Sequence, residues 1–141
     1  MSHSLVREAM VRDPLALEAS ASAQEAGERL ADPDVRAVLV CDEGRLVGVV
    51  TRKTLVREVV ARGLDPRGTT LREIAEPPLH TIAADTDLEA AFHELEQRDL
   101  ERVPVTEADG RLVGVLSRAV VQRRLAEDEP PAADDEALSP L

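Results

Sequence analysis

Apolar residues along this chain form two kinds of pattern, and the two kinds alternate in an order that occurs twice. Short, continuously apolar runs predict buried strands, because a strand covered on both faces needs no polar alternation. Apolar residues spaced three and four apart predict amphipathic helices. In the first round the predicted strands are 15–17, 37–40 and 46–50, and the predicted helices are one that follows Ser22 and one at 52–61. In the second round the strands are 79–82, 102–105 and 112–116, and the helices are one that follows Thr86 and one at 118–126.

Local sequence signals define the ends of these helices. Ser22 is followed three residues later by Glu25, which is the spacing of a capping box, and Thr86 begins the same pattern. Gly63 follows the helix 52–61, as expected for a helix that ends in a left-handed residue. The buried faces predicted for two of the helices are Leu55, Val56, Val59 and Val60, and Leu88, Ala91, Phe92 and Leu95.

The hexapeptide 44–49 returns residue for residue at 110–115, which identifies the two rounds as copies of one unit. Gly48, inside a predicted strand, indicates close approach by another backbone or a ligand. Each unit has a three-stranded sheet with one open face, so two units bury their open faces against each other. We expect an α/β (α+β) fold of two β-α-β-β-α repeats. The predicted boundaries are repeat 1 at 4–63, a linker at 64–70, repeat 2 at 71–126 and a disordered acidic tail at 127–141.

The net charge is −11 over 141 residues, and the segment 127–141 holds six acidic residues and no basic one. Acidic surfaces repel phosphate backbones, and Phe92 is the only aromatic residue that could stack on a base, so nucleic acid binding is disfavoured. The sequence contains no run of eighteen apolar residues and does not start like a signal peptide. We therefore expect a cytoplasmic protein without a membrane segment.

Catalytic and metal-binding patterns are missing from the sequence. Cys41 is the single cysteine, and His3, His80 and His93 are too scattered for metal-ligand spacing. No nucleophile elbow and no phosphate-binding glycine loop occur, so we expect neither enzymatic activity nor a metal cofactor. Cys41 is interpreted as a small buried hydrophobic residue, with a redox or intermolecular role as the alternative.

The order and duplication of these motifs resemble the CBS domain family, in which tandem repeats form a CBS pair, or Bateman module. The resemblance rests on Val6…Met10…Pro14, on the segment 102–105, and on the two Gly-Arg-Leu-Val-Gly-Val blocks with the hydroxyl that follows each. It covers about 120 of the 141 residues and implies that the two repeats pack as an intramolecular CBS pair.

In that family the cleft between paired repeats often holds AMP, ATP or S-adenosylmethionine. Adenine lies among aliphatic side chains, and phosphate lies at a hydroxyl and at the N-terminus of the last helix. The resemblance implies these ligand-binding residues: Leu17, Val38, Leu39, Thr51, Arg52, Lys53 and Thr54 in the first half-site, and Ile82, Val103, Pro104, Ser117 and Arg118 in the second.

Two positions depart from the family's pattern. In the family an aspartate three residues after the hydroxyl holds the ribose, and the corresponding positions here are Thr54 and Val120. The first half-site is therefore the better candidate, and we expect Thr54→Asp to tighten binding. Thr51 and Ser117 also have an ordinary explanation as helix N-caps. If the hydroxyls only cap their helices, Arg52, Lys53 and Arg118 are solvated surface residues, although positive charge in a first helical turn opposes the helix dipole.

Two functions stay open at this point. One is a regulatory module that binds AMP, ADP, ATP or S-adenosylmethionine between its repeats and modulates a protein partner of unknown identity; the resemblance also implies a homodimer. The alternative is a ligand-free, degenerate pair that acts as a dimerisation or protein-interaction scaffold, and the missing aspartates favour it.

Overall fold

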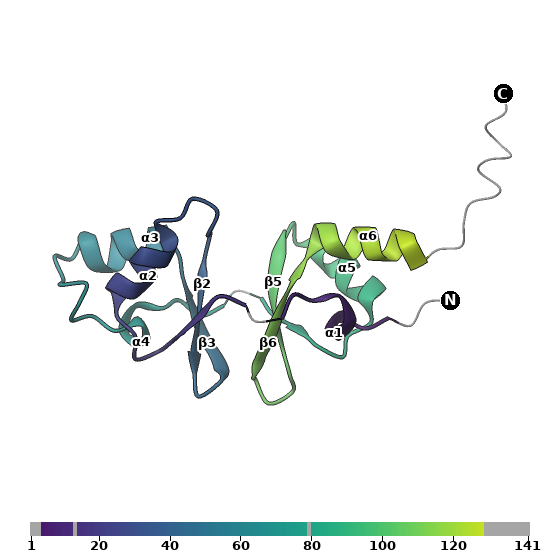
Figure 1. Ribbon diagram of the computed structural model, residues 1–141, viewed down its shortest axis with the longest axis horizontal. Helices are drawn as coiled ribbons and strands as arrows, with labels where there is room; N and C mark the ends of the chain where they lie inside the picture. Colours follow the sequence, from purple (N-terminus) through teal and green to yellow (C-terminus); the bar gives the residue numbers. More distant parts are fainter. Residues whose placement is uncertain (1–3, 13, 79, 129–141) are drawn as a thin grey trace, which may run out of the picture.

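The computed structural model describes residues 4–12, 14–78 and 80–128. The molecule consists of two similar halves placed side by side, each with a three-stranded sheet and a layer of helices (Figure 1). The two sheets lie toward the centre of the molecule, and the helices lie on the outer sides. The mixed α/β fold predicted from the sequence is confirmed.

The element order repeats as the apolar pattern predicts. The first half contains β1 (Ala16–Glu18), α2 (Ala23–Leu30), β2 (Val38–Asp42), β3 (Arg45–Val50), α3 (Arg52–Leu55) and the π-helical turn η1 (Val56–Val60). The second half contains β4 (Ile82–Ala83), α5 (Leu88–Gln97), β5 (Arg102–Thr106), β6 (Leu112–Ser117) and α6 (Arg118–Asp128). Two single-turn helices, α1 (Val6–Ala9) and α4 (Leu71–Ile74), precede the two rounds.

Both sheets have the same strand order and register. In the first half β1 is parallel to β2 and β2 is antiparallel to β3, and in the second half β4, β5 and β6 are arranged in the same way. Each antiparallel pair has an irregularity at the same place, between Val40 and Cys41 in one sheet and between Val105 and Thr106 in the other. The repeat in the sequence is therefore a repeat in three dimensions.

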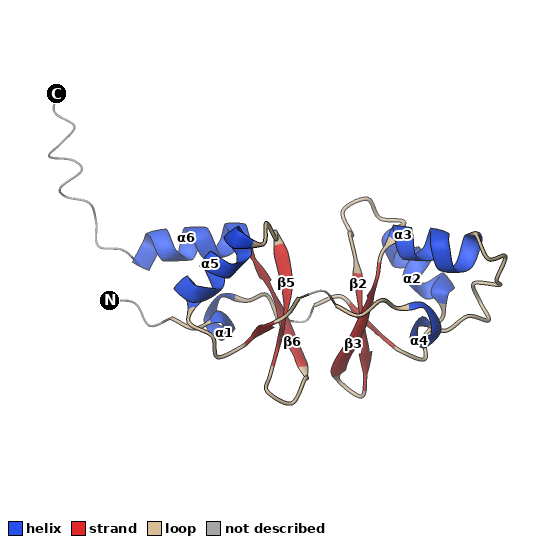
Figure 2. Cartoon of the chain, turned by 180° about the vertical axis from the view of Figure 1, so that it is seen from behind, coloured by secondary structure: helices blue, strands red, loops and turns tan. Residues whose placement is uncertain are grey.

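The two single-turn helices are exchanged between the halves. Val6 of α1 is fully buried in the hydrophobic core of the second half, and its amide donates to the carbonyl of Thr86 at 2.9 Å. Leu71 of α4 is fully buried in the core of the first half, and its amide donates to the carbonyl of Ala21 at 2.9 Å. Figure 2 shows each helix beside the half that it completes. Each core is therefore built from both repeats.

A partly exposed ion-pair network fastens α1 to the second half. Arg7 Nη2 lies 2.7 Å from Asp85 Oδ1 and 2.9 Å from Glu107 Oε1. The hydrogen bonds that Arg7 donates to Glu107 and Asp85 raise the pKa of Arg7 above its ordinary value. Because both acceptors belong to the second repeat, the network holds the N-terminal segment on the far half.

Gly48 and Gly114 permit the crossing segments to reach the sheets. A Cβ atom at Gly48 would lie 2.7 Å from Cβ of Ala75 and 3.0 Å from the carbonyl oxygen of Glu76. A Cβ atom at Gly114 would lie 2.7 Å from Sδ of Met10 and 2.8 Å from the carbonyl oxygen of Val11. The close backbone approach that the sequence indicated at Gly48 is confirmed.

We expect Gly48→Ala and Gly114→Ala each to lower the free energy of unfolding by about 1–3 kcal/mol, because the added methyl group forces backbone to move. Chemical denaturation measures the effect. Gly27→Ala is the matched control: the nearest atom to its Cβ, Leu55 Cδ1, lies at 3.8 Å. This substitution in the middle of α2 is expected to stabilise by roughly 0.5–1 kcal/mol. Equal effects of all three substitutions would contradict the close approach.

Two local predictions are wrong. Val56 and Val60 are exposed, at 56% and 71%, because only Leu55 and Val59 of this stripe face the core. After Leu55 the helix changes to π-type hydrogen bonding. The bond from the Ala61 amide to the Val56 carbonyl, 2.8 Å, is of this type. The second predicted capping box is shifted by one residue, since Asp87 is the N-cap of α5 and accepts from the Ala90 amide at 3.2 Å.

Other boundaries differ by one or a few residues. The predicted first strand lies one residue later than expected, and the strand predicted at 79–82 begins only at Ile82. Leu79 lies outside the described residues. The last helix continues to Asp128, and the rest of the acidic tail, 129–141, also lies outside the described residues.

Candidate functional site

The corner where β3 ends and α3 begins is closed by two threonines. Thr51 is the N-cap of α3: its Oγ1 accepts from the Thr54 amide at 3.3 Å, and the Thr51 amide donates to Thr54 Oγ1 at 3.0 Å. The two hydroxyl oxygens are 3.1 Å apart. This reciprocal capping box satisfies helix-terminal N–H groups, so the ordinary explanation of Thr51 as a cap holds in this structure.

Glu76 adds a carboxylate to the same corner from the other repeat. Thr54 is fully buried, and its hydroxyl donates to Glu76 Oε2 at 2.6 Å. Arg57 Nη2 donates to Glu76 Oε1 at 2.9 Å. The hydrogen bond from Thr54 lowers the pKa of Glu76 most strongly; desolvation opposes this shift, and Arg57 and Lys53 lower the pKa further. Glu76 is therefore ionised at neutral pH.

The two basic residues at the start of α3 have different environments. Arg52 turns toward the end of α2 and donates from Nη2 to the carbonyl of Asp32 at 2.9 Å. Lys53, the only lysine in the sequence, is exposed and makes no hydrogen bond or ion pair with any residue that the structure describes. Of the two cations predicted for this half-site, Lys53 is the one available to an anion.

The equivalent corner of the second half has a different composition. Ser117 Oγ accepts from the Val120 amide at 3.4 Å and so caps α6. Arg118 forms ion pairs with Glu101 and, at 3.5 Å, with Asp99. Val120 stands in the place of Thr54, and Val11 stands in the place of Glu76. The second corner therefore has neither the buried hydroxyl nor the carboxylate that it binds, and its arginine is held in ion pairs.

The predicted adenine-lining residues lie on two different faces of their strands. Val38 and Val103 belong to the hydrophobic cores beneath the helices, as does Ile82, and Leu17 packs against the first core. Leu39 and Pro104 are the next residues along their strands, and side chains alternate between faces. Leu39 and Pro104 therefore lie on the sheet faces that point away from the cores.

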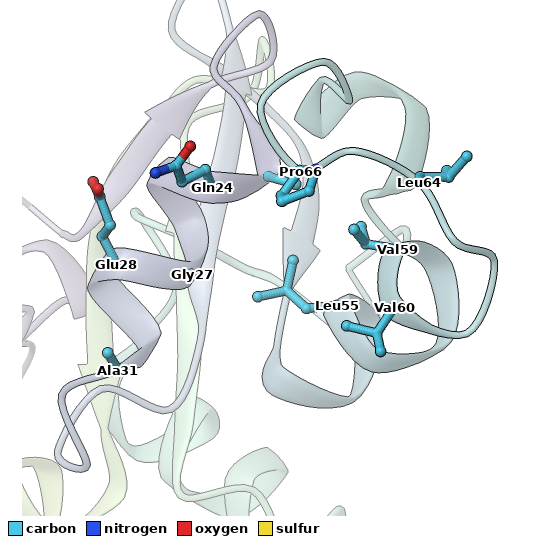
Figure 3. A pocket seen from close by; sticks show the side chains of 10 residues that line it. Gln24, Gly27, Glu28, Ala31, Leu55, Val59, Val60, Leu64 and Pro66 are labelled. Atoms are coloured by element: carbon cyan, nitrogen blue, oxygen red, sulfur yellow. The ribbon is translucent and has the colours of Figure 1, made fainter.

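An apolar groove lies on the outer side of the first half, between α2 and the π-helical turn (Figure 3). Its volume is about 480 Å³. It is lined by Ala23, Gln24, Gly27, Glu28, Ala31, Leu55, Val59, Val60, Leu64 and Pro66. Gly27 aligns with Phe92 of the second repeat, and Phe92 packs against the second core. At the corresponding position of the first half, glycine has no side chain to occupy the groove.

A second cavity, of similar volume, lies between the two hairpin turns. It is lined by Asp42, Glu43, Arg45, Val47, Asp109 and Arg111. The turns are joined by backbone hydrogen bonds from the Leu46 amide to the Gly110 carbonyl, 3.1 Å, and from the Leu112 amide to the Gly44 carbonyl, 3.0 Å. These bonds hold the two sheets together at the end opposite the threonine corner.

Residues 4–12, 14–78 and 80–128 contain no group of three His, Cys, Asp or Glu residues placed to hold a metal ion. In the same part of the chain no helix has the length and apolar character needed to cross a membrane. Cys41 is buried, and burial raises the pKa of its thiol.

Sequence reasoning missed Glu76. Its position follows from the exchange of α4, which the linear pattern does not reveal. A signal was nevertheless present. When the two repeats are aligned by a shift of 65 residues, Glu76 corresponds to Val11, so a charged residue stands in the place of an apolar one.

The comparisons with known proteins agree with the repeat. The family model described as CBS domain matches residues 6–61 and 71–127. The chain is 31% identical to Hypoxic response protein 1 of Mycobacterium tuberculosis over 103 residues, which are 72% of this chain and 71% of the relative.

Two solved structures are also similar. The structure of Hypoxic Response Protein I with two coordinated zinc ions has a TM-score of 0.70 at 25% identity. The aligned region covers 86% of this chain and 98% of the Hypoxic Response Protein I chain. The structure of CBSX2, a CBS-pair protein from Arabidopsis thaliana, in complex with AMP has a TM-score of 0.67 at 28% identity. That comparison covers 87% of this chain and 96% of the other.

Proposed function

The chain belongs to the CBS domain family as a tandem pair, and we propose that it is a regulatory module that binds one adenosine-type ligand in its first half. The proposed ligand class is AMP, with ADP, ATP and S-adenosylmethionine as relatives of the same chemistry. A ligand shifts a conformational equilibrium only through different affinities for its states, so the ligand is proposed to favour one packing of the two halves over another. This change in packing is proposed to be transmitted to a protein partner.

The observation that carries this proposal is the exposed Lys53 ammonium beside the capped start of α3. Helix N-termini favour anions through their N–H groups and dipole, and a free ammonium adds charge-assisted donors. Ala119 replaces this lysine in the second half, and Arg118 is already held by Glu101. The similar CBS-pair structure with AMP supports the ligand class.

We expect Lys53→Ala to weaken AMP binding about tenfold, because a charge-assisted contact to phosphate is lost. Binding of adenosine, which lacks the phosphate, should change little. Isothermal titration calorimetry with both ligands measures the difference, and Arg123→Ala, an equal loss of charge on the second half, is the matched control. Lys53→Ala and Arg123→Ala with the same AMP affinity as the unsubstituted chain would refute the phosphate role of Lys53.

A second candidate function is a ligand-free interaction scaffold. It is favoured by the capping roles of Thr51 and Ser117 and by the engagement of Arg52 and Arg118, which explain these residues without a ligand. A thermal-shift screen with AMP, ADP, ATP and S-adenosylmethionine separates the two functions. A ligand present at a hundred times its Kd stabilises the folded state by about 2.7 kcal/mol, and no shift at millimolar concentration of any of them would favour the scaffold.

We also propose that the groove of the first half contacts a second copy of the chain. Val56 and Val60 are large apolar side chains that stand largely in solvent beside an apolar groove. Contiguous exposed apolar surface of this kind is typical of protein interaction sites. The homodimer implied by the family resemblance fits this surface.

Val60→Glu is expected to convert the proposed dimer to a monomer, because a carboxylate would be buried without a partner. Light scattering coupled to size-exclusion chromatography measures the mass. Val47→Glu, at an exposed position beside the cavity between the hairpin turns and outside the groove, should leave the dimer intact. A monomeric unsubstituted chain, or equal masses for both variants, would argue against this interface.

A further inference from the structure

Glu76 reaches the threonine corner because the segment that follows α4 crosses to the first half. Its amide donates to the carbonyl of Val49 at 2.9 Å, and its carbonyl accepts from the Val49 amide at 2.8 Å. This pair of backbone bonds fixes Glu76 against β3. The position of its side chain is thus set by the same exchange that completes the first core.

The carboxylate of Glu76 is oriented by two donors and still has acceptor capacity. Thr54 bonds one oxygen and Arg57 the other, whereas an ionised carboxylate offers about four acceptor positions. The side chain is 42% exposed, so the remaining positions are open to solvent or to a ligand. Lys53 lies near enough to contribute to the electrostatic environment of Glu76. An oriented, ionised acceptor therefore stands near a free ammonium.

The second half lacks both Thr54 and Glu76. Val11 forms an isolated β-bridge with Val115, as Glu76 does with Val49, and Val120 occupies the position of Thr54. The polar pair Thr54–Glu76 of the first half is therefore an apolar pair, Val120 and Val11, in the second. Val11 is 56% exposed. The two corners share their backbone and differ in the chemistry that they present.

We propose that Glu76 is a ligand-binding residue that accepts hydrogen bonds from the vicinal hydroxyl groups of the ribose. It supplies from the crossing segment the carboxylate that position 54 lacks. The inference rests on the proposed function, since it presupposes a nucleoside ligand in the first half. It also makes the site depend on both repeats, because Thr51 and Lys53 come from the first and Glu76 from the second.

The test compares AMP with 2′,3′-dideoxy-AMP, on the unsubstituted chain and on Glu76→Gln, by isothermal titration calorimetry. The unsubstituted chain should prefer AMP by about tenfold, as expected for lost charge-assisted hydrogen bonds. Glu76→Gln should lose most of that preference, because the amide replaces an ionised acceptor with a neutral group. Glu73→Gln, the same change of charge on the exposed face of α4, should keep it.

Two further results separate the proposal from a purely structural role. Arg57→Ala removes the ion pair but leaves the carboxylate, so it should retain the preference for AMP. If Glu76→Gln weakens both nucleotides equally, or leaves the preference unchanged, Glu76 does not bind the ribose and the proposal falls while the nucleotide site stands. If the unsubstituted chain binds neither nucleotide at millimolar concentration, the proposed function itself fails.

Discussion

Leu71→Ala is expected to destabilise the first half of the molecule by about 2–5 kcal/mol, although Leu71 belongs by sequence to the second repeat. The side chain is fully buried in a core that also contains Val38, Val50 and Val59. Removing a leucine side chain from a packed core costs the transfer free energy and leaves a cavity. The cost should therefore fall on the half to which α4 has been exchanged.

Chemical denaturation gives the size of this effect, and native-state hydrogen exchange gives its location. Amide protection should fall first in β2 and β3 and less in β5 and β6. Leu64→Ala, at a partly exposed position of the connecting loop, is the control and should have a small effect. Loss of protection confined to β5 and β6 would contradict the exchange of α4 between the halves.

Thr54→Asp is expected to destabilise the chain by roughly 3 kcal/mol and to weaken AMP binding, which reverses the expectation from the family motif. The Thr54 hydroxyl lies 2.6 Å from Glu76 Oε2 at a fully buried position. An aspartate there would place two carboxylates in contact, so one of them would have to bind a proton or move away.

A second substitution makes this prediction specific. In Thr54→Asp with Glu76→Gln, the glutamine amide can donate to the new carboxylate, and most of the lost stability should return. Thermal unfolding of the single and double variants measures the recovery, with Glu73→Gln as the control for the change in charge. Unchanged stability together with tighter AMP binding in Thr54→Asp alone would restore the motif-based expectation.

The repeat made most of the fold predictable. The identical blocks at 44–49 and 110–115 define the paired strands, and the apolar runs and stripes give the rest of each unit. The exchange of α1 and α4 could not be predicted in the same way. Val6 and Leu71 align with each other across the repeat, so their local sequences do not distinguish the core that each one joins.

The π-helical turn was missed for a related reason. The spacing of Leu55, Val56, Val59 and Val60 fits a regular helical stripe, and nothing in it marks the change to π-type hydrogen bonding or the exposure of Val56 and Val60. The groove beside them is lined by Gly27, which lies in the place of Phe92. A comparison of the two repeats position by position contains that signal.

The candidate site was predictable in its position and only partly in its chemistry. The hydroxyls at the helix starts follow from the motif, and both lie where it places them. The orientations of Arg52 and Arg118 depend on acceptors that are distant in the sequence or lie in a neighbouring loop. Glu76 enters the site only through the crossing of the chain, and a motif confined to one repeat does not contain it.

The two corners differ in chemistry, and we propose that one adenosine-type ligand binds the first half. This asymmetry can be measured by an NMR titration with AMP, followed through assigned backbone amide resonances. We expect saturable shifts at Thr51–Leu55 and at Glu76, with little change at Ser117–Val121. Equal shifts in both corners, or no shift at millimolar AMP, would refute a single site in the first half.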